Sequence, residues 1–233
     1  MKKSAPPSTA TGREAPAKTG YFSGLCRSKA AGRPTQAEAE ALGDHILDAG
    51  WELLLDQGFE RFSFDRLARF ARIGKPTIYA RFANKEELLR ALLVSRIEQR
   101  QREVVADAMG HELDVVLPAL AFHAVEKFRS PEGRLIDRLI DWLDYEAGAD
   151  RPSLRGWALE STQRTLEAVL GDANSASSSQ IDDIPTAARF LLEGIAGHAK
   201  MVDARVGDTA GEADWAARYS AMILKHFARA GEG

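Results

Sequence analysis

The sequence predicts an all-helical protein of about nine helices. Apolar residues recur at helical spacing in one segment after another, and runs that alternate in the manner of strands are hard to find. With 233 residues, 45% of them hydrophobic and 28% charged, the chain can form one large or two modest cores. It contains no run of about 18 apolar residues and begins with polar residues, so we expect neither a membrane span nor a secretory signal, and a cytoplasmic location.

The first expected helix covers residues 36–57 and follows a segment of different composition. Residues 1–34 are rich in Ala, Pro, Ser, Thr, Gly and Lys without apolar periodicity, which predicts a disordered basic arm. The arm holds the single cysteine, Cys26, which cannot form an internal disulfide and is interpreted as an incidental thiol. In residues 36–57 apolar residues recur at helical spacing, and Gly58 follows as a suitable left-handed cap.

Two short helices follow. Ser63 can cap a helix that ends near Ala71, and after a turn of three residues a second helix covers 75–82, with Ile78 and Phe82 four residues apart on its inner face. Two short helices joined by such a turn form a helix-turn-helix, whose second helix can enter the DNA major groove.

The remainder of the chain is expected to consist of longer helices. Asn84 and Glu87 form a capping box that begins the first of them. Ser130 as cap and Pro131 at the first position begin another, and Pro118 implies a kink or a later start in the helix before it. The sequence predicts helices at about 112–129, 131–147, 152–170, 185–206 and 212–230, with loops at 171–183 and 207–212.

Basic residues are concentrated in two stretches, although the net charge is −3. In the arm they are Lys2, Lys3, Arg13, Lys18, Arg27, Lys29 and Arg33, against Glu14 alone. In the helix-turn-helix region they are Arg61, Arg66, Arg69, Arg72, Lys75, Arg81 and Lys85, against Asp65 alone. This distribution is expected for a single phosphate-binding surface on an otherwise acidic protein. A basic face that is exposed to solvent and binds nothing would have the same distribution.

The region from Gly58 to Leu88 strongly resembles the TetR family of transcriptional regulators. The family pattern has Gly-Phe, a capping Ser or Thr, Ala-Gly-Val-Ser-x-x-Thr-x-Tyr-x-x-Phe and Lys-Glu-x-Leu, and here it reads GFERFSFDRLARFARIGKPTIYARFANKEEL. The resemblance is specific over about residues 42–93 and architectural beyond them. It implies a helix-turn-helix DNA-binding domain at 35–83 and an effector-binding and dimerisation domain at 84–233.

The resemblance also assigns roles to individual residues. Lys75, Pro76 and Thr77, at the start of the second short helix, are expected to contact base edges. Ser63, Tyr79, Arg81 and Lys85 are expected to hold phosphates, although a buried Tyr79 ring is the alternative for that residue. Arg33 either enters the minor groove or belongs to a plain linker.

Two residues of the turn depart from the family pattern. Arg72 stands where the family usually has Gly, and Gly74 stands where it usually has a capping Ser. A left-handed Arg costs roughly 1 kcal/mol, and Gly caps a helix less well than Ser. Our hypothesis is that Arg72 contacts a phosphate and that Gly74 lets the backbone approach DNA closely.

The C-terminal part is expected to bind an unknown small-molecule effector and to form a homodimer. Candidate pocket residues, each also explicable as ordinary core, are Phe122, His123, Phe128, Leu139, Trp142 and Trp157. The last two helices have wide apolar faces that predict a four-helix interface with a second subunit, or core within one subunit. The residues on these faces are Ala188, Leu191, Leu192, Ile195, Ala199, Val202, Trp215, Tyr219, Met222, Ile223 and Phe227.

An enzyme is the main alternative from another class of protein. The sequence lacks HExxH, paired CxxC, GxSxG, GxxxxGK[ST] and the Rossmann glycine pattern, and its histidines are scattered without metal-ligand spacing. We therefore expect no enzymatic activity, no metal and no cofactor. A helical ligand-binding module without DNA binding is a further alternative, favoured by Arg72 and Gly74 and opposed by Thr77, Tyr79 and Lys85.

Overall fold

The computed structural model describes residues 35–148, 151–178, 180–203 and 211–228. The predicted arm, with Cys26 and Arg33, lies outside these residues. The chain divides into a unit of residues 1–39 and a unit of residues 40–233. In the first unit, Thr35 Oγ1 accepts a hydrogen bond from the Glu38 backbone N–H (3.2 Å), and Glu38 Oε2 accepts one from the Thr35 backbone N–H (2.9 Å). This reciprocal pair caps the start of α1.

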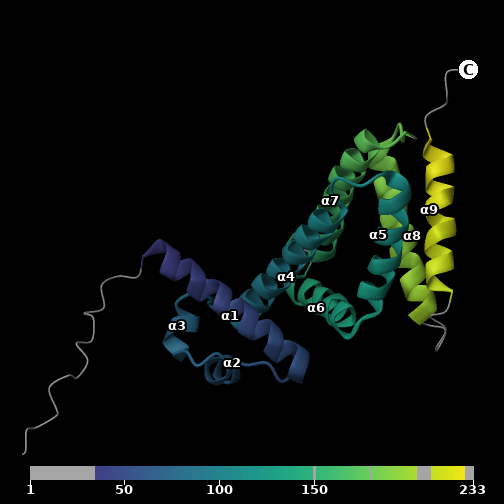
Figure 1. The fold of residues 1–233 in the computed structure, drawn as a ribbon. Helices are drawn as coiled ribbons and strands as arrows, with labels where there is room; N and C mark the ends of the chain where they lie inside the picture. The colour runs from purple at the N-terminus through teal and green to yellow at the C-terminus, as the bar shows by residue number, and fades with distance from the viewer. Residues whose placement is uncertain (1–34, 149–150, 179, 204–210, 229–233) are drawn as a thin grey trace, which may run out of the picture. The chain divides into compact units, whose positions relative to one another are not determined.

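The predicted all-helical fold is confirmed over the described residues, which form nine helices and no strand. Within this part of the chain, no helix is both long and apolar enough to cross a membrane. The helices, coloured along the chain in Figure 1, are α1 (Gln36–Gln57), α2 (Phe64–Phe70), α3 (Lys75–Tyr79), α4 (Lys85–Ala108), α5 (Leu113–Arg129), α6 (Pro131–Ala147), α7 (Leu154–Ala176), α8 (Ile184–Asp203) and α9 (Glu212–Phe227).

The helix starts that the sequence predicts from capping residues are confirmed. The side chains of Ser63 and Ser130 each accept a backbone N–H three residues ahead, at the starts of α2 and α6. Asn84 accepts the backbone N–H of Glu87 at 2.8 Å, and the Glu87 carboxylate returns a bond to the Ala83 N–H rather than to Asn84 itself. Gly58, after α1, has the predicted left-handed conformation, with φ of 74°.

Two predicted boundaries are wrong. Helix α3 ends at Tyr79 rather than Phe82, and α7 continues to Ala176 through much of the predicted loop at 171–183. Ala173, on this added stretch of α7, is fully buried, so packing extends a helix that local composition would end. Helix α5 begins at Leu113, close to the predicted start, and contains Pro118, so of the two alternatives for this proline the later start is excluded.

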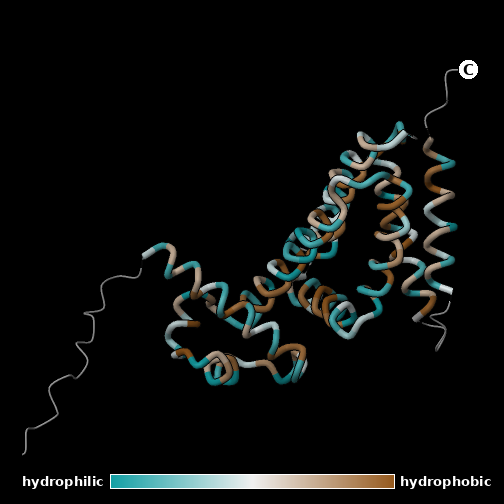
Figure 2. The backbone as a smooth tube through the Cα atoms, viewed as in Figure 1, coloured by the Kyte–Doolittle hydropathy of each residue, from teal (hydrophilic) through white to brown (hydrophobic). Residues whose placement is uncertain are grey.

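The buried side chains form two clusters. The first joins α1, α2 and α3 with the N-terminal half of α4, with α6 and with the start of α7. The second joins the remainder of α4 with α5, α7, α8 and α9, and in it α5 packs against both α8 and α9. Figure 2 shows hydrophobic and hydrophilic residues interleaved along α5, α6 and α9, as expected for helices with one buried face. Helix α4 takes part in both clusters.

Candidate DNA-binding site

The turn between α2 and α3 contains a strained residue. Arg72 has φ of 57° and is the one described residue other than glycine with a positive φ, so the predicted left-handed conformation is confirmed. The backbone N–H of Ile73 closes the turn on the Ala68 carbonyl at 3.0 Å. The Arg72 side chain is exposed, and nothing in its own fold requires a guanidinium there. A conformation that costs about 1 kcal/mol is therefore kept for a side chain that faces solvent.

Gly74 is the N-cap of α3, and its backbone does not require glycine. Its φ is −70° and its ψ is 140°, which any residue adopts, and it makes no side-chain cap bond. A Cβ at this position would meet Pro76 Cδ at 3.6 Å and Thr77 Oγ1 at 3.7 Å, which are ordinary contacts. The fold would accept the Ser that the TetR pattern has here. The absence of a side chain at Gly74 is compatible with close approach by a partner molecule.

Helix α3 is anchored by a single buried residue and presents the others outward. Ile78 is fully buried, whereas Lys75 and Pro76 are exposed and Thr77 is half-buried. The Lys75 ammonium pairs with the Asp65 carboxylate of α2 at 2.5 Å, and both side chains are more than half exposed. This ion pair can yield to another anion at little cost, because exposed pairs contribute about 0–1 kcal/mol.

Tyr79 lies on the outer face of α3 with 56% of its surface exposed, so the alternative of a buried ring is wrong. Its ring packs on Phe64 of α2, with centroids 4.7 Å apart. Because Phe64 is itself buried, the contact holds the Tyr79 ring in place without covering its outer side. Tyr79 is thus a surface residue with a fixed ring.

The predicted phosphate ligands occupy different environments. Ser63 Oγ accepts the Arg66 backbone N–H at 3.3 Å, and Arg81 is half-buried. The Lys85 ammonium donates to the Phe59 carbonyl at 2.7 Å, in the turn after α1. Partial burial lowers the pKa of Lys85, and the nearby charge of Glu60 acts in the opposite direction. Lys85 therefore supports the α1–α2 connection and keeps two ammonium N–H groups for other partners.

Two further arginines lie beside this surface and were not among the predicted site residues. Arg66 donates to Gln57 Oε1, and Arg69 Nε donates to the Asp65 carbonyl at 3.2 Å. They line an open hollow of about 340 Å³ together with Leu53, Gln57 and Phe70. The charge of residues 61–85 could have identified both, since they belong to the basic stretch described above.

The six predicted pocket residues are not brought together. Leu139, Trp142 and Trp157 belong to the first hydrophobic cluster, and Phe122 packs against the second. His123 is exposed and pairs with Glu126 at 3.5 Å, and Phe128 is 44% exposed. The three predicted pocket residues of α5 therefore lie in different surroundings from the three of α6 and α7.

The predicted dimer residues separate into two groups. Ala188, Leu191, Leu192, Ile195, Ala199 and Ile223 are buried against their own chain. They have almost no exposed surface left, because they pack with residues of α5, α7, α8 and α9 in the second cluster, so these six agree with the alternative of core within one subunit. The other group remains accessible, with Met222 52% exposed and Val202, Trp215, Tyr219 and Phe227 half-buried.

Aromatic rings stack along the accessible side of α8 and α9. His198 and Trp215 are stacked with centroids 3.7 Å apart, and Trp215 and Tyr219 with centroids 5.0 Å apart. The Tyr219 hydroxyl donates to the Phe190 carbonyl, and burial raises the pKa of this tyrosine. An open hollow of about 410 Å³ lies beside the stack and is lined by Gly211, Asp214, Trp215, Arg218, Tyr219 and Met222.

The fold and the α2–turn–α3 geometry define a helix-turn-helix protein. Residues 46–92 match the family model described as bacterial regulatory proteins, tetR family. This segment contains α2, α3 and the turn between them. The comparisons confirm the TetR-type resemblance predicted from the sequence.

Curated relatives share the N-terminal region. The regulator SrpR of Pseudomonas putida is 39% identical over 64 residues, which cover 28% of this chain and 30% of the relative. The DNA-binding transcriptional repressor TetR of Mycobacteroides abscessus is 39% identical over 80 residues, which cover 34% of this chain and 42% of the relative. The alignments thus span less than half the length of either relative.

A solved structure shares the fold over most of the chain. A TetR-family transcriptional regulator from Pectobacterium atrosepticum superposes with a TM-score of 0.60 and 16% sequence identity, over 85% of this chain and 100% of the other. At this identity the likeness concerns the fold alone. The C-terminal helices therefore follow an arrangement known from TetR-family structures, without specifying what this chain binds.

Arg72→Gly is expected to raise the free energy of unfolding by up to about 1 kcal/mol, because glycine adopts a positive φ without steric cost. If the guanidinium contacts a phosphate, the same variant binds all duplexes more weakly to a similar degree. Arg72→Ala is the control, since it removes the guanidinium but keeps the strained backbone. Thermal unfolding and DNA titration of both variants check this, and unchanged affinity in both would exclude Arg72 as a DNA contact.

Proposed function

We propose that this protein is a sequence-specific DNA-binding transcriptional regulator that works as a homodimer and represses transcription until a small-molecule effector releases it from its operator. The single observation that carries the proposal is the outward face of α3. There Lys75, Pro76 and Thr77 are accessible at the start of a helix that Ile78 anchors from behind. The first turn of a recognition helix is the part that meets base edges in the major groove.

The surroundings of α3 support a division of roles. Thr77 and Pro76 can contact a thymine methyl group and Lys75 can contact guanine. Tyr79, Arg72, Ser63, Arg81 and Lys85 would hold phosphates and so set the register, with the Gly74 backbone close to the DNA. The neighbouring Arg66 and Arg69 extend the same basic surface. Arg33 would contribute from the arm.

The homodimer is proposed to form through the accessible sides of α8 and α9. Phe190 and Met222 are exposed, and Met222 lines the hollow beside α9 together with the stacked rings of Trp215 and Tyr219. Large apolar side chains at the surface are typical of protein interfaces. A two-fold axis there would present two α3 helices to successive major grooves about 34–36 Å apart, and the operator would be a pseudo-palindrome.

The effector is proposed to bind among α4 to α7, although the six residues predicted from the sequence do not form one wall. Half-buried Trp142 and Trp157 pack against the first cluster, which also contains buried residues of the DNA-binding helices. Release requires the effector to prefer a conformation with misplaced recognition helices, and each tenfold preference supplies about 1.4 kcal/mol of coupling. A protein with this role acts where the chromosome lies, in agreement with the cytoplasmic location expected from the sequence.

Selection of sites from a random duplex library at about 0.15 M salt tests the proposal, followed by titration of the winner against a scrambled duplex. We expect a palindromic site that binds at least ~10³-fold more tightly than the scramble. No enrichment, with or without added candidate effectors, would favour a helical ligand-binding module instead.

Tyr79→Phe is expected to weaken binding to all sequences alike, whereas Thr77→Ala is expected to change base preference at one position of each half-site. The phenylalanine ring can keep the contact with Phe64, so only the hydroxyl is lost. Lys85→Ala is a poorer test, because it also removes the hydrogen bond to the Phe59 carbonyl. Repeating the site selection with both variants measures the difference, and identical profiles would contradict the division of roles.

A further inference from the structure

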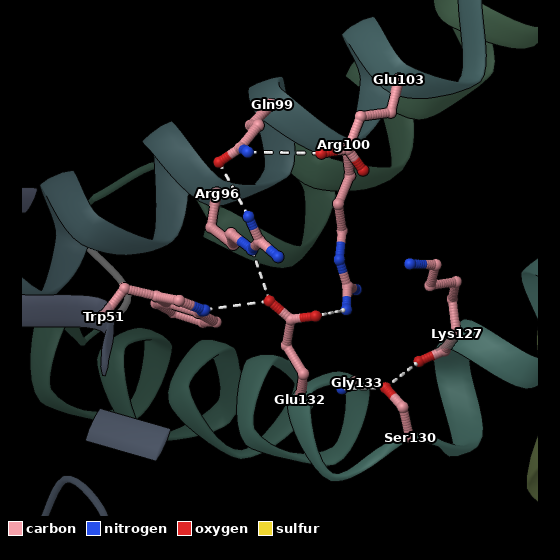
Figure 3. A network of polar contacts seen from close by, with 9 residues as sticks. All are labelled: Trp51, Arg96, Gln99, Arg100, Glu103, Lys127, Ser130, Glu132 and Gly133. Atoms are coloured by element: carbon pink, nitrogen blue, oxygen red, sulfur yellow. Dashed lines mark hydrogen bonds and ion pairs between the residues drawn. The ribbon is translucent and has the colours of Figure 1, made fainter. Parts of the chain in front are cut away.

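Glu132, the second residue of α6, lies between three helices. Figure 3 shows its carboxylate held between Trp51 of α1 and the guanidinium groups of Arg96 and Arg100 on α4. Oε1 accepts hydrogen bonds from Trp51 Nε1 at 2.9 Å and from Arg96 Nε, and Oε2 accepts one from Arg100 at 2.7 Å. One carboxylate thus joins α1, α4 and α6.

The electrostatics keep this carboxylate ionised. Burial by itself would raise the pKa of Glu132, but the hydrogen bonds and charges of the two arginines lower it to about 2. The side chains of Glu132, Arg96 and Arg100 are 17%, 23% and 20% exposed, so solvent screens the pairs only in part. Its place in the first turn of α6 also suits a negative charge.

The network continues along α4. Arg96 donates a second hydrogen bond to Gln99 Oε1 at 2.8 Å, and Gln99 donates to Glu103 at 3.3 Å. The Arg96 guanidinium also lies over the Trp51 ring, 5.9 Å from its centroid. Arg96 is therefore held by contacts other than that with Glu132, which makes its geometry at the carboxylate specific.

The partner on α1 connects the network to the DNA-binding helices. Trp51 is 8% exposed and belongs to the same cluster as Leu53, Leu67 and Ile78 of α1, α2 and α3. Apolar contacts also join this region to α6, including that of the Phe59 and Trp142 rings at 5.8 Å. Apolar contacts tolerate sliding, whereas a hydrogen bond to a charged carboxylate fixes direction and distance.

We propose that Glu132 is a positioning residue that holds the DNA-binding helices at a set orientation on α4 and α6, so that two recognition helices of a dimer match the spacing of two half-sites. This inference rests on the proposed function, and it names α6 as the element through which a conformational change would reach α1. A dimer gains from two half-sites only if both α3 helices can engage them at once.

Glu132→Gln keeps the shape of the side chain and removes its charge, and Trp51→Phe keeps the charge and removes the indole N–H. We expect Glu132→Gln to weaken binding to the full palindrome by about tenfold and binding to a duplex with one half-site by less than about twofold. Trp51→Phe is expected to weaken full-site binding by about threefold, as for one hydrogen bond. Glu146→Gln, at an exposed position of α6, is the matched control and should change neither.

Hydrogen exchange of α1 peptides, measured without DNA, gives an independent readout. Exchange should be faster in Glu132→Gln and Trp51→Phe than in the wild type and in Glu146→Gln. If the wild type selects no DNA site, the proposed function fails while this measurement still decides the role of Glu132. Unchanged exchange, or an equal loss of affinity for half-site and full-site duplexes, would overturn the inference.

Discussion

Gly133→Ala is expected to destabilise the protein by about 3 kcal/mol, a large effect for one added methyl group. Gly133 is the third residue of α6, and a Cβ there would lie 2.1 Å from the Lys127 carbonyl oxygen and 2.4 Å from that of Phe128. Both are backbone atoms at the end of α5, so the clash cannot be relieved by a side-chain rotation. The α5–α6 corner would have to open, and chemical denaturation of the variant would measure the loss.

Gly156→Ala is the matched control. Gly156 is the third residue of α7, and its backbone N–H donates to the capping Ser153 just as that of Gly133 donates to Ser130. A Cβ on Gly156 would find its nearest neighbour at 3.8 Å, so this variant should be neutral or more stable by up to about 1 kcal/mol. Equal effects at the two glycines would contradict the close approach of α5 and α6.

Glu212→Ala is expected to cost about 3 kcal/mol of stability, because it removes one partner of a buried ion pair. The Glu212 carboxylate, at the start of α9, pairs with the Arg129 guanidinium at the end of α5, and the two side chains are 6% and 17% exposed. Without the carboxylate, the Arg129 charge remains in a largely water-excluded position. Thermal unfolding at several protein concentrations would separate this effect from any change in subunit association.

The control for this prediction lies two residues further along α9. Asp214 is exposed and pairs with Arg218 one turn ahead, so Asp214→Ala removes an acidic residue from the same helix end at a cost of under about 1 kcal/mol. A small effect at Glu212, comparable to that at Asp214, would mean that the Arg129–Glu212 pair contributes little to holding α5 and α9 together.

Both large effects concern helix junctions on which the proposed function depends. Gly133 is adjacent to Glu132, so opening the α5–α6 corner would also displace the carboxylate that joins α6 to Trp51 and the arginines of α4. Glu212 fixes α9 against α5, and α9 carries part of the proposed dimer surface. Stability and DNA binding are therefore expected to fall together in Gly133→Ala.

Features that depend on a few consecutive residues were predicted correctly from the sequence. Ser63, Asn84 and Ser130 cap the helices expected of them, and Gly58 and Arg72 have the expected left-handed conformations. Caps and turns are made by the side chain or backbone of the residue itself with neighbours three or four positions away. The helix-turn-helix is built from such local features, which is why its motif is recognisable without a structure.

Which partner covers a helix face was decided only by the tertiary structure. The periodicity of Leu191 and Ile195 identifies an apolar face of α8, but the pattern is the same whether α5 and α7 or a second subunit covers it. Phe122 and Trp142 are likewise both apolar, and nothing in the sequence indicates that they pack against different clusters. Gly133 and the Trp51–Glu132 hydrogen bond, which joins residues 81 positions apart, depend on the approach of distant helices, and no local pattern encodes that approach.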